Sequence, residues 1–204
     1  MNWNISITNP NSLIIVAHPD DETIFCGGTM LSFLRWRWNI VCVTMQTDTS
    51  RPREFEKAME MYKSYGVNIV SYLTLNKRDE NQSLSSKEYN DWRNSIQQLN
   101  SKPKIVFTHN KEGEYGHPHH KVINRIVCEL FSNVWEFVYP GDKNITPQPT
   151  KSKINKVKLP RDVLDKKKRI FNDCYNSQLA GLRNNLPYLM DYELNSGPEI
   201  FTSD

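Results

Sequence analysis

Two short clusters of polar residues carry the side chains best suited to chemistry. The first is His18-Pro19-Asp20-Asp21-Glu22, which follows directly on an apolar run. His18 and Asp21 are three positions apart, so a tight turn or the first turn of a helix can aim an imidazole and a carboxylate at one point. That pair of side chains suits zinc or another divalent metal. The acidic residues could instead serve only to stabilise the N-terminus of a helix, and this cluster alone does not decide between the two interpretations.

The second cluster holds three of the five histidines of the chain within four positions, at His117, His119 and His120. His117 and His120 can share one face of a helix that begins near Pro118. Together the two clusters offer a His–Asp–His ligand set, and three protein ligands with an open fourth position are typical of catalytic zinc. Such a metal lowers the pKa of bound water toward ~7 and polarises a carbonyl, while a nearby carboxylate can take the proton of the water.

The elements around these clusters predict how they meet. Short apolar runs predict strands at Leu13–Ala17, Ile40–Met45, Ile69–Leu75, Ile105–Thr108 and Val134–Tyr139. Helices are predicted between and after them, at Thr29–Trp38, Arg51–Tyr65, Tyr89–Leu99, Val122–Phe131 and Val163–Gln178. This alternation predicts an α/β fold, a Rossmann-like doubly wound three-layer sandwich with a mostly parallel sheet. Ligands of such sheets bind outside the carboxyl ends of the strands, where both clusters lie.

Length and composition limit the classes of protein that remain. The chain has 204 residues, and we expect residues 1–204 to form a single domain. Its 26 basic and 23 acidic residues give a net charge of +3, which is too small to indicate nucleic-acid binding. The four cysteines are scattered, which fits a reducing compartment. No apolar run approaches the ~20 residues of a membrane span, and no basic residue precedes Arg35, so we expect a cytoplasmic protein without a signal peptide.

The two clusters together resemble the motifs of the PIG-L/LmbE-like deacetylases. The resemblance rests on Ala17-His18-Pro19-Asp20-Asp21-Glu22 and on the later His117-Pro118-x-His120. Weaker similarities are the helix start Thr23–Met30, the pattern Arg51, Glu54 and Ala58, the pair Ser177-Gln178, and Glu199-Ile200-Phe201. The resemblance implies hydrolytic N-deacetylation of an N-acetylglucosamine-type amino-sugar derivative, with Zn²⁺ or another divalent metal as cofactor.

The resemblance also implies a role for individual residues. It implies His18, Asp21 and His120 as metal ligands, and Asp20 as the base that activates the metal-bound water. His117 would stabilise the oxyanion or protonate the leaving amine. One position departs from the family pattern, because many members have Asp where this chain has His119. We expect His119 to point away from the metal.

Other residues near the clusters are candidates for supporting roles. Arg51, Glu114 and Tyr115 are expected to contact the substrate. Glu22 could orient His18, or it could act only as a favourable charge at a helix N-terminus. His109 is expected to be structural or exposed rather than a ligand.

Two questions about substrate and function stay open at this point. The segment Lys151–Arg169 holds nine of the 26 basic residues, and it could be a solvated face or could attract a phosphate-bearing substrate. A non-catalytic sugar- or nucleotide-binding module on the same fold is the alternative function, since a fold does not fix an activity. A homo-oligomer is possible, and neither a nucleic acid nor a membrane span is expected.

Overall fold

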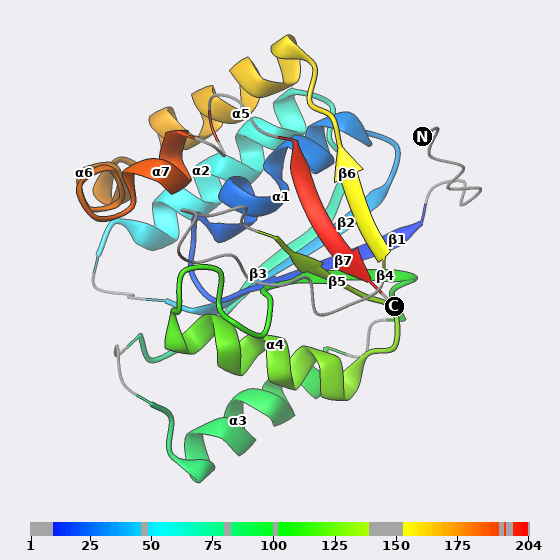
Figure 1. Ribbon diagram of the computed structural model, residues 1–204, viewed down its shortest axis with the longest axis vertical. Coiled ribbons are helices and arrows are strands. Elements are labelled where there is room, and N and C mark those ends of the chain that lie inside the picture. The colour runs from blue at the N-terminus through cyan, green and yellow to red at the C-terminus, as the bar shows by residue number, and fades with distance from the viewer. Residues whose placement is uncertain are drawn as a thin grey trace.

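The computed structural model describes residues 10–45, 49–79, 83–99, 102–138, 153–191, 194 and 198–203. Within these residues the chain forms one seven-stranded sheet with helices on both faces (Figure 1). The strands are β1 (Asn11–Val16), β2 (Arg37–Thr44), β3 (Ile69–Lys77), β4 (Ile105–Thr108), β5 (Val134–Phe137), β6 (Lys153–Val157) and β7 (Glu199–Ser203). The helices are α1 (Asp21–Ser32), α2 (Arg51–Ser64), α3 (Ser86–Gln97), α4 (Pro118–Leu130), α5 (Arg161–Cys174), α6 (Asn176–Asn185) and α7 (Pro187–Asp191).

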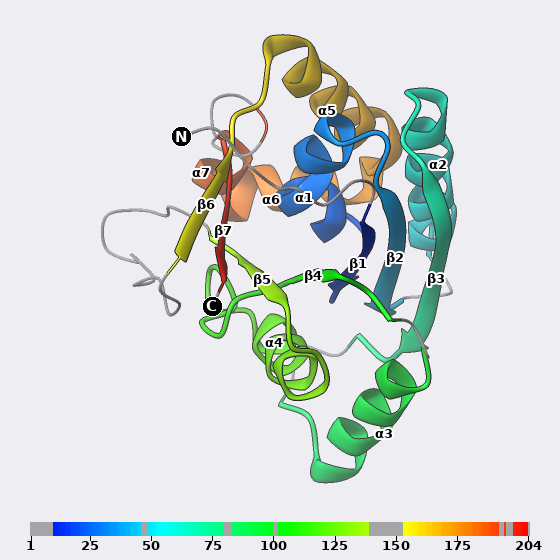
Figure 2. The same cartoon turned by 90° about the vertical axis from the view of Figure 1, so that its right-hand side faces the viewer.

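The strand order is β3-β2-β1-β4-β5-β7-β6. Strands β1 to β5 pair in parallel, whereas β7 is antiparallel to β5 and β6 is antiparallel to β7. Helices α3 and α4 cover one face of the sheet, and α1, α2 and α5 cover the other (Figures 1 and 2). The predicted α/β class and the mostly parallel three-layer arrangement are therefore confirmed.

Strand β1 shows why the strand predictions from apolar runs succeed. Ile14 and Val16 pack into the core beneath α1, α2 and α5, and Leu13 and Ile15 pack into the core beneath α3 and α4. Because both faces of the strand are buried, its run Leu13–Val16 is apolar throughout and shows no alternation with polar residues.

The predicted helix Thr29–Trp38 is wrong. The helix is α1, which begins at Asp21 and ends at Ser32, and β2 already begins at Arg37. The pair Gly27-Gly28 suggested a helix start, but it lies inside the helix where neighbouring segments come close. A Cβ atom on Gly28 would lie 2.4 Å from the Leu159 side chain and 3.0 Å from a Glu199 carboxylate oxygen, so a larger residue there would have to displace Leu159.

The C-terminal part of the chain also differs from its prediction. The predicted helix Val163–Gln178 is two helices, α5 and α6, and the chain breaks between them at Tyr175, with φ −102° and ψ 48°. The last ~20 residues had no assignment because they lack a clear period, and they contain β7, which completes the pairing of β5. Tyr139, at the end of the predicted fifth strand, lies outside the described residues. No helix of the described segments is long and apolar enough to cross a membrane.

A buried ion pair ties β7 to α1. The Nζ atom of Lys167 on α5 donates to Glu199 at 2.8 Å and to the carbonyl of Ile24 at 2.6 Å. Glu199 in turn accepts the backbone N–H groups of Gly28 and Thr29 at 2.7 and 2.6 Å. Since Lys167 and Glu199 are 0% and 1% exposed, the buried Glu199 carboxylate has Lys167 as its counter-charge.

We predict that Lys167→Met lowers the free energy of unfolding by about 3–5 kcal/mol, because it leaves the Glu199 carboxylate buried without its counter-charge. Urea denaturation followed by circular dichroism measures this loss. The matched control is Lys168→Met, whose side chain is exposed, and its effect should stay below about 1 kcal/mol. Equal urea midpoints of unfolding for Lys167→Met and Lys168→Met would show that the ion pair of Lys167 and Glu199 does not stabilise the fold.

Candidate metal centre

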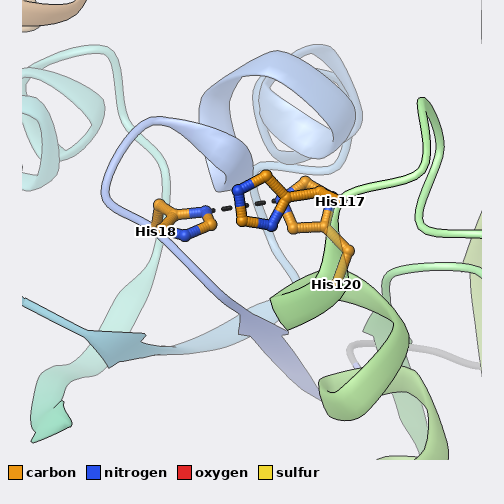
Figure 3. Close-up of side chains that lie close together, drawn as sticks. All are labelled: His18, His117 and His120. Atoms are coloured by element: carbon orange, nitrogen blue, oxygen red, sulfur yellow. Dashed lines mark hydrogen bonds between the residues drawn. The ribbon is translucent and has the colours of Figure 1, made fainter. Parts of the chain in front are cut away.

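The two polar clusters meet where the strand order reverses. Strand β1 has β2 on one side and β4 on the other, so the segments that leave β1 and β4 diverge at their carboxyl ends. This is the position at which doubly wound sheets bind ligands. His18 follows β1, and His117 and His120 lie at the start of α4 after β4 (Figure 3).

Three candidate ligand atoms form a nearly equilateral triangle. Nδ1 of His18 lies 3.2 Å from Oδ2 of Asp21 and 3.4 Å from Nε2 of His120. Nε2 of His120 lies 3.4 Å from the same oxygen of Asp21. Ligand atoms ~2.0–2.2 Å from a tetrahedral zinc are about 3.3–3.6 Å apart, so the triangle fits one such ion.

The outer nitrogen of each of these histidines faces a carboxylate. Nδ1 of His120 contacts Glu114 at 2.6 Å, and Nε2 of His18 lies 3.4 Å from Asp79. In metal sites such carboxylates fix the tautomer and orientation of the ligand ring and raise its basicity. The arrangement leaves Nδ1 of His18 and Nε2 of His120 as acceptors, and these are the two nitrogens in the triangle.

Glu114 does not border a substrate pocket as expected. Its side chain is 0% exposed and bridges His120 and Nδ1 of His109, the latter at 3.0 Å. Burial raises the pKa of Glu114, but the neighbouring His109 and His120 outweigh it and lower the pKa to about 2, so the carboxylate stays charged. The flanking Gly113 and Gly116, with φ of 70° and 96°, build the turn that folds Glu114 inward.

His109 lies beside the triangle but is not suited to join it. Its Nε2 is 3.4 Å from Oδ2 of Asp21. By proximity alone, a metal could be held by Asp21, His109 and His120. However, that nitrogen accepts the backbone N–H of Ala17 at 2.9 Å, which occupies its lone pair. His109 therefore links the end of β1 to Glu114.

His119 does not point away from the centre, contrary to expectation. It is 1% exposed, and its Nδ1 lies 3.4 Å from Nε2 of His18 and 3.5 Å from Asp79. The ring packs edge-on against Trp92 at 5.3 Å between centroids. The expectation failed because it used only the helical spacing of His119 from His117 and His120, whereas His119 lies in the first turn of α4 and meets Asp79 of the segment after β3.

Asp79 is a site residue that the sequence analysis did not identify. One oxygen faces His18 and His119, and the other accepts from Arg51 at 3.0 Å. Burial raises the pKa of Asp79, but its histidine partners and Arg51 hold it well below the usual range. Its position after β3, at the carboxyl edge of the sheet, was the available signal. The group His18, Asp79 and His119 could also hold a metal by proximity, but it shares His18 with the triangle.

Asp20 is the carboxylate of the first cluster that does not belong to the triangle. It precedes α1 at the N-cap position, yet its side chain makes no capping hydrogen bond. Burial raises the pKa of Asp20 well above its usual range, and the adjacent Asp21 raises it further. For Asp21 itself burial also raises the pKa, but His120 and His109 hold it well below the usual range.

His117 occupies the N-cap position of α4. Its ring centroid lies 4.6 Å from those of His18 and His120 (Figure 3). Its Nδ1 accepts the backbone N–H of His119 at 3.3 Å, so the neutral ring carries its proton on Nε2. Burial, together with His120 and His18, lowers the pKa of His117 to about 3, and the ring is uncharged at neutral pH.

Glu22 makes its hydrogen bonds away from His18. Its carboxylate accepts from the backbone N–H of Asp20 at 3.1 Å and from the hydroxyls of Thr23 and Tyr175. Burial raises the pKa of Glu22 to about 7. The hypothesis that Glu22 orients His18 is therefore not supported by these contacts.

Arg51 and Tyr115 lie near the centre. Arg51 donates to Asp79 and to the side-chain oxygen of Gln178. The ring of Tyr115 lies 5.3 Å from that of His120 and is half-buried.

We predict that Glu114→Ala weakens zinc binding by about 10–100-fold, because His120 loses the carboxylate that fixes its ring. Competition with a chromophoric chelator measures the affinity. Glu112→Ala is the control, since that side chain is exposed two positions away. Unchanged affinity in Glu114→Ala would contradict the role of Glu114 in holding a ligand.

Known proteins resemble this chain in sequence and in fold. The uncharacterized protein L374 of Acanthamoeba polyphaga mimivirus is 26% identical over 151 residues, which are 65% of this chain and 63% of that protein. The chain thus spans less than two thirds of that relative. N,N'-diacetylchitobiose deacetylase from Pyrococcus horikoshii superposes with a TM-score of 0.60 and 19% identity, over 96% of this chain and 84% of its own. The zinc-inhibited form of teicoplanin deacetylase superposes with a TM-score of 0.69 and 15% identity, over 95% of this chain and 97% of its own.

The family is shown by a match to a sequence model. The model of the PIG-L family, described as GlcNAc-PI de-N-acetylase, matches residues 13–131. That range contains both polar clusters and spans β1 to α4. Because the match covers more than half of the 204 residues, this chain belongs to the PIG-L family.

Proposed function

We propose that this chain is a zinc-dependent N-deacetylase that hydrolyses the amide of an N-acetylglucosamine-type amino-sugar derivative. The family description supports an amino-sugar de-N-acetylase, and two structural neighbours are named deacetylases. The observation that carries the proposal is the triangle of His18, Asp21 and His120 with the uncapped Asp20 carboxylate beside it in sequence.

His18, Asp21 and His120 would hold the metal. Zinc bound there would polarise the acetyl carbonyl and lower the pKa of a bound water toward ~7. The donor set of two imidazoles and one carboxylate suits zinc, and three protein ligands leave a position open for reactants. One structural neighbour is the zinc-inhibited form of teicoplanin deacetylase, which fits a divalent metal on this fold.

Asp20 would act as the general base. Its carboxylate takes a proton from the attacking water as the oxygen adds to the acetyl carbon. The raised pKa of Asp20 makes its ionised form a stronger base than an ordinary aspartate. The carboxylate is available for this step because neither helix capping nor the ligand triangle uses it.

His117 would stabilise the transition state. Its Nε2–H can donate a hydrogen bond to the oxyanion that develops from the acetyl carbonyl. Because the pKa of His117 is lowered to about 3, protonation of the leaving amine would require the ring to take up a proton first. We therefore favour oxyanion stabilisation over the acid role. Breakage of the C–N bond, with the proton that Asp20 took from the water passed on to the leaving nitrogen, then yields acetate and the amine.

Arg51 and Tyr115 would contact the sugar, as the family resemblance implies. The basic segment is less suited to bind substrate. The C-terminal end of α5 lies near the centre, because Tyr175 donates to Glu22 there. The helix has 14 residues, so its N-terminal end at Arg161 is about 20 Å from Tyr175 along the helix axis. We therefore interpret the basic residues near Arg161 as a solvated face rather than a phosphate site.

The cysteines support a reducing compartment. Cys26, Cys42 and Cys174 are buried free thiols. We propose that the protein works in the cytoplasm, where thiols stay reduced.

We predict that Asp20→Asn lowers kcat for acetate release by ~10²–10⁴-fold while zinc content is unchanged. The acid limb of the wild-type kcat/KM profile should lie above pH 3.8, the ordinary Asp pKa, because activity is lost as pH falls through the raised pKa of Asp20. That limb should vanish in the variant. Acetate assays on N-acetylglucosamine conjugates and elemental analysis provide the data, with the exposed Asp165→Asn as control. A near-normal rate with intact zinc would assign the base to another group.

We predict a larger loss for His117→Ala than for His119→Ala, with zinc retained in both. Loss of the oxyanion donor should cost ~10²–10⁴-fold in kcat. His119→Ala should cost less than about 10-fold, since Asp79 still holds the outer nitrogen of His18. The opposite ranking of the two kcat values would mean that His119, not His117, acts on the substrate.

A further inference from the structure

Asp20 adopts a backbone conformation that is rare for any residue other than glycine. Its φ is 111° and its ψ is −34°. A side chain with a Cβ atom is disfavoured there, so surrounding contacts must hold it in place. The Asp20 carbonyl accepts from the N–H groups of Thr23 and Ile24, both at 2.9 Å, and so starts α1. The conformation thus allows Asp20 to begin the helix without using its own carboxylate as a cap.

The Asp20 N–H group is held by Glu22. Oε2 of Glu22, the second residue of α1, accepts this N–H at 3.1 Å, as the third helical residue does in a capping box, whereas the Asp20 side chain makes no cap hydrogen bond in return. Glu22 is 0% exposed. A buried backbone N–H without an acceptor is costly, and Glu22 supplies that acceptor.

Two further helices fix the Glu22 carboxylate. Its Oε1 accepts from the hydroxyl of Thr23 at 2.6 Å and from that of Tyr175 at 2.5 Å, at the end of α5. The hydroxyl of Tyr62 on α2 donates to Thr23 at 2.9 Å. Both tyrosines are buried, so Glu22 is oriented by side chains from outside its own helix.

We infer that Glu22 is a positioning residue that holds the backbone of Asp20, and so the direction of its carboxylate, toward the reacting centre. The inference rests on the proposed role of Asp20 as base. Glutamate suits the position because both of its oxygens accept, toward three donors in all. Glutamine offers one oxygen and should replace it only in part.

A double-mutant cycle on zinc-loaded protein tests whether Glu22 acts through Asp20. Glu22→Ala should lower kcat by up to about 100-fold, with KM and zinc content nearly unchanged, and Glu22→Gln should recover part of the rate. In the Asp20→Asn background, Glu22→Ala should cause no further loss. An equal loss in both backgrounds, or a loss of zinc, would overturn the inference. Glu56→Ala, exposed on α2, is the control.

Hydrogen exchange gives a readout that does not depend on activity. Glu22→Ala should lose protection at the Asp20 amide while the Ile24 amide stays protected. If Glu22→Ala does not fold, Tyr175→Phe removes one hydrogen bond from the same carboxylate and should give a smaller, equally non-additive loss of kcat. Unchanged protection at Asp20 overturns the inference. Absence of acetate release from wild type would instead refute the proposed function, and the exchange result would still decide whether Glu22 holds Asp20.

Discussion

One oxygen of Asp21 lies between the imidazoles of His18 and His120, and the geometry of the site depends on this contact. The same oxygen accepts the backbone N–H of His18 at 2.8 Å, which fixes the turn after β1. A buried carboxylate needs its charge balanced, and a divalent cation held at this point would supply that balance. The remaining contacts of the site keep the two histidines and this oxygen at the spacing of metal ligands.

The fold supplies those contacts from several directions. The N–H of Ala17 is held by His109, and Glu114 joins His109 to His120, so the segments after β1 and β4 are fixed to each other. Asp79 approaches His18 from the segment after β3. Within α1, the backbone N–H of Gly28 donates to Glu199, which is paired with Lys167 of α5, and these contacts hold α1 in place. The supports come from the segments after β3 and β4 and from α5 and β7, so the geometry of the site depends on elements that are far apart in the sequence.

The parts that could be predicted from sequence are those set by local pattern. The apolar runs predicted β1 to β5. Strands covered on both faces are largely apolar, as in β4, where every residue is buried, whereas the edge strand β3 was predicted although it is partly exposed. The two motifs identified His18, Asp20, Asp21, His117 and His120, since short spacing puts side chains on one turn. The inward turn of Glu114 was not predicted, although two glycines flank it. Glu114 was expected to contact the substrate because its contacts with His109 and His120 are not visible in the sequence.

What could not be predicted depends on contacts between distant segments. Glu22 was linked to His18 by proximity in sequence, whereas its partner Tyr175 comes from the end of α5. Asp79 sits in a polar segment that has no motif, and only the packing of β3 beside β2 brings it near His18. The C-terminal strand β7 shows no clear hydrophobic period in the sequence, and its position is set by its pairing with β5.

The most direct test of this account is X-ray absorption at the zinc edge of protein loaded with one zinc per chain. The triangle predicts two imidazole nitrogens and one carboxylate oxygen, with bond lengths of ~2.0–2.2 Å, in a four-coordinate site. A third imidazole would contradict the account, because it would make His117, His109 or His119 a ligand. It would also remove the separation between the residues that hold the metal and those that act on the substrate.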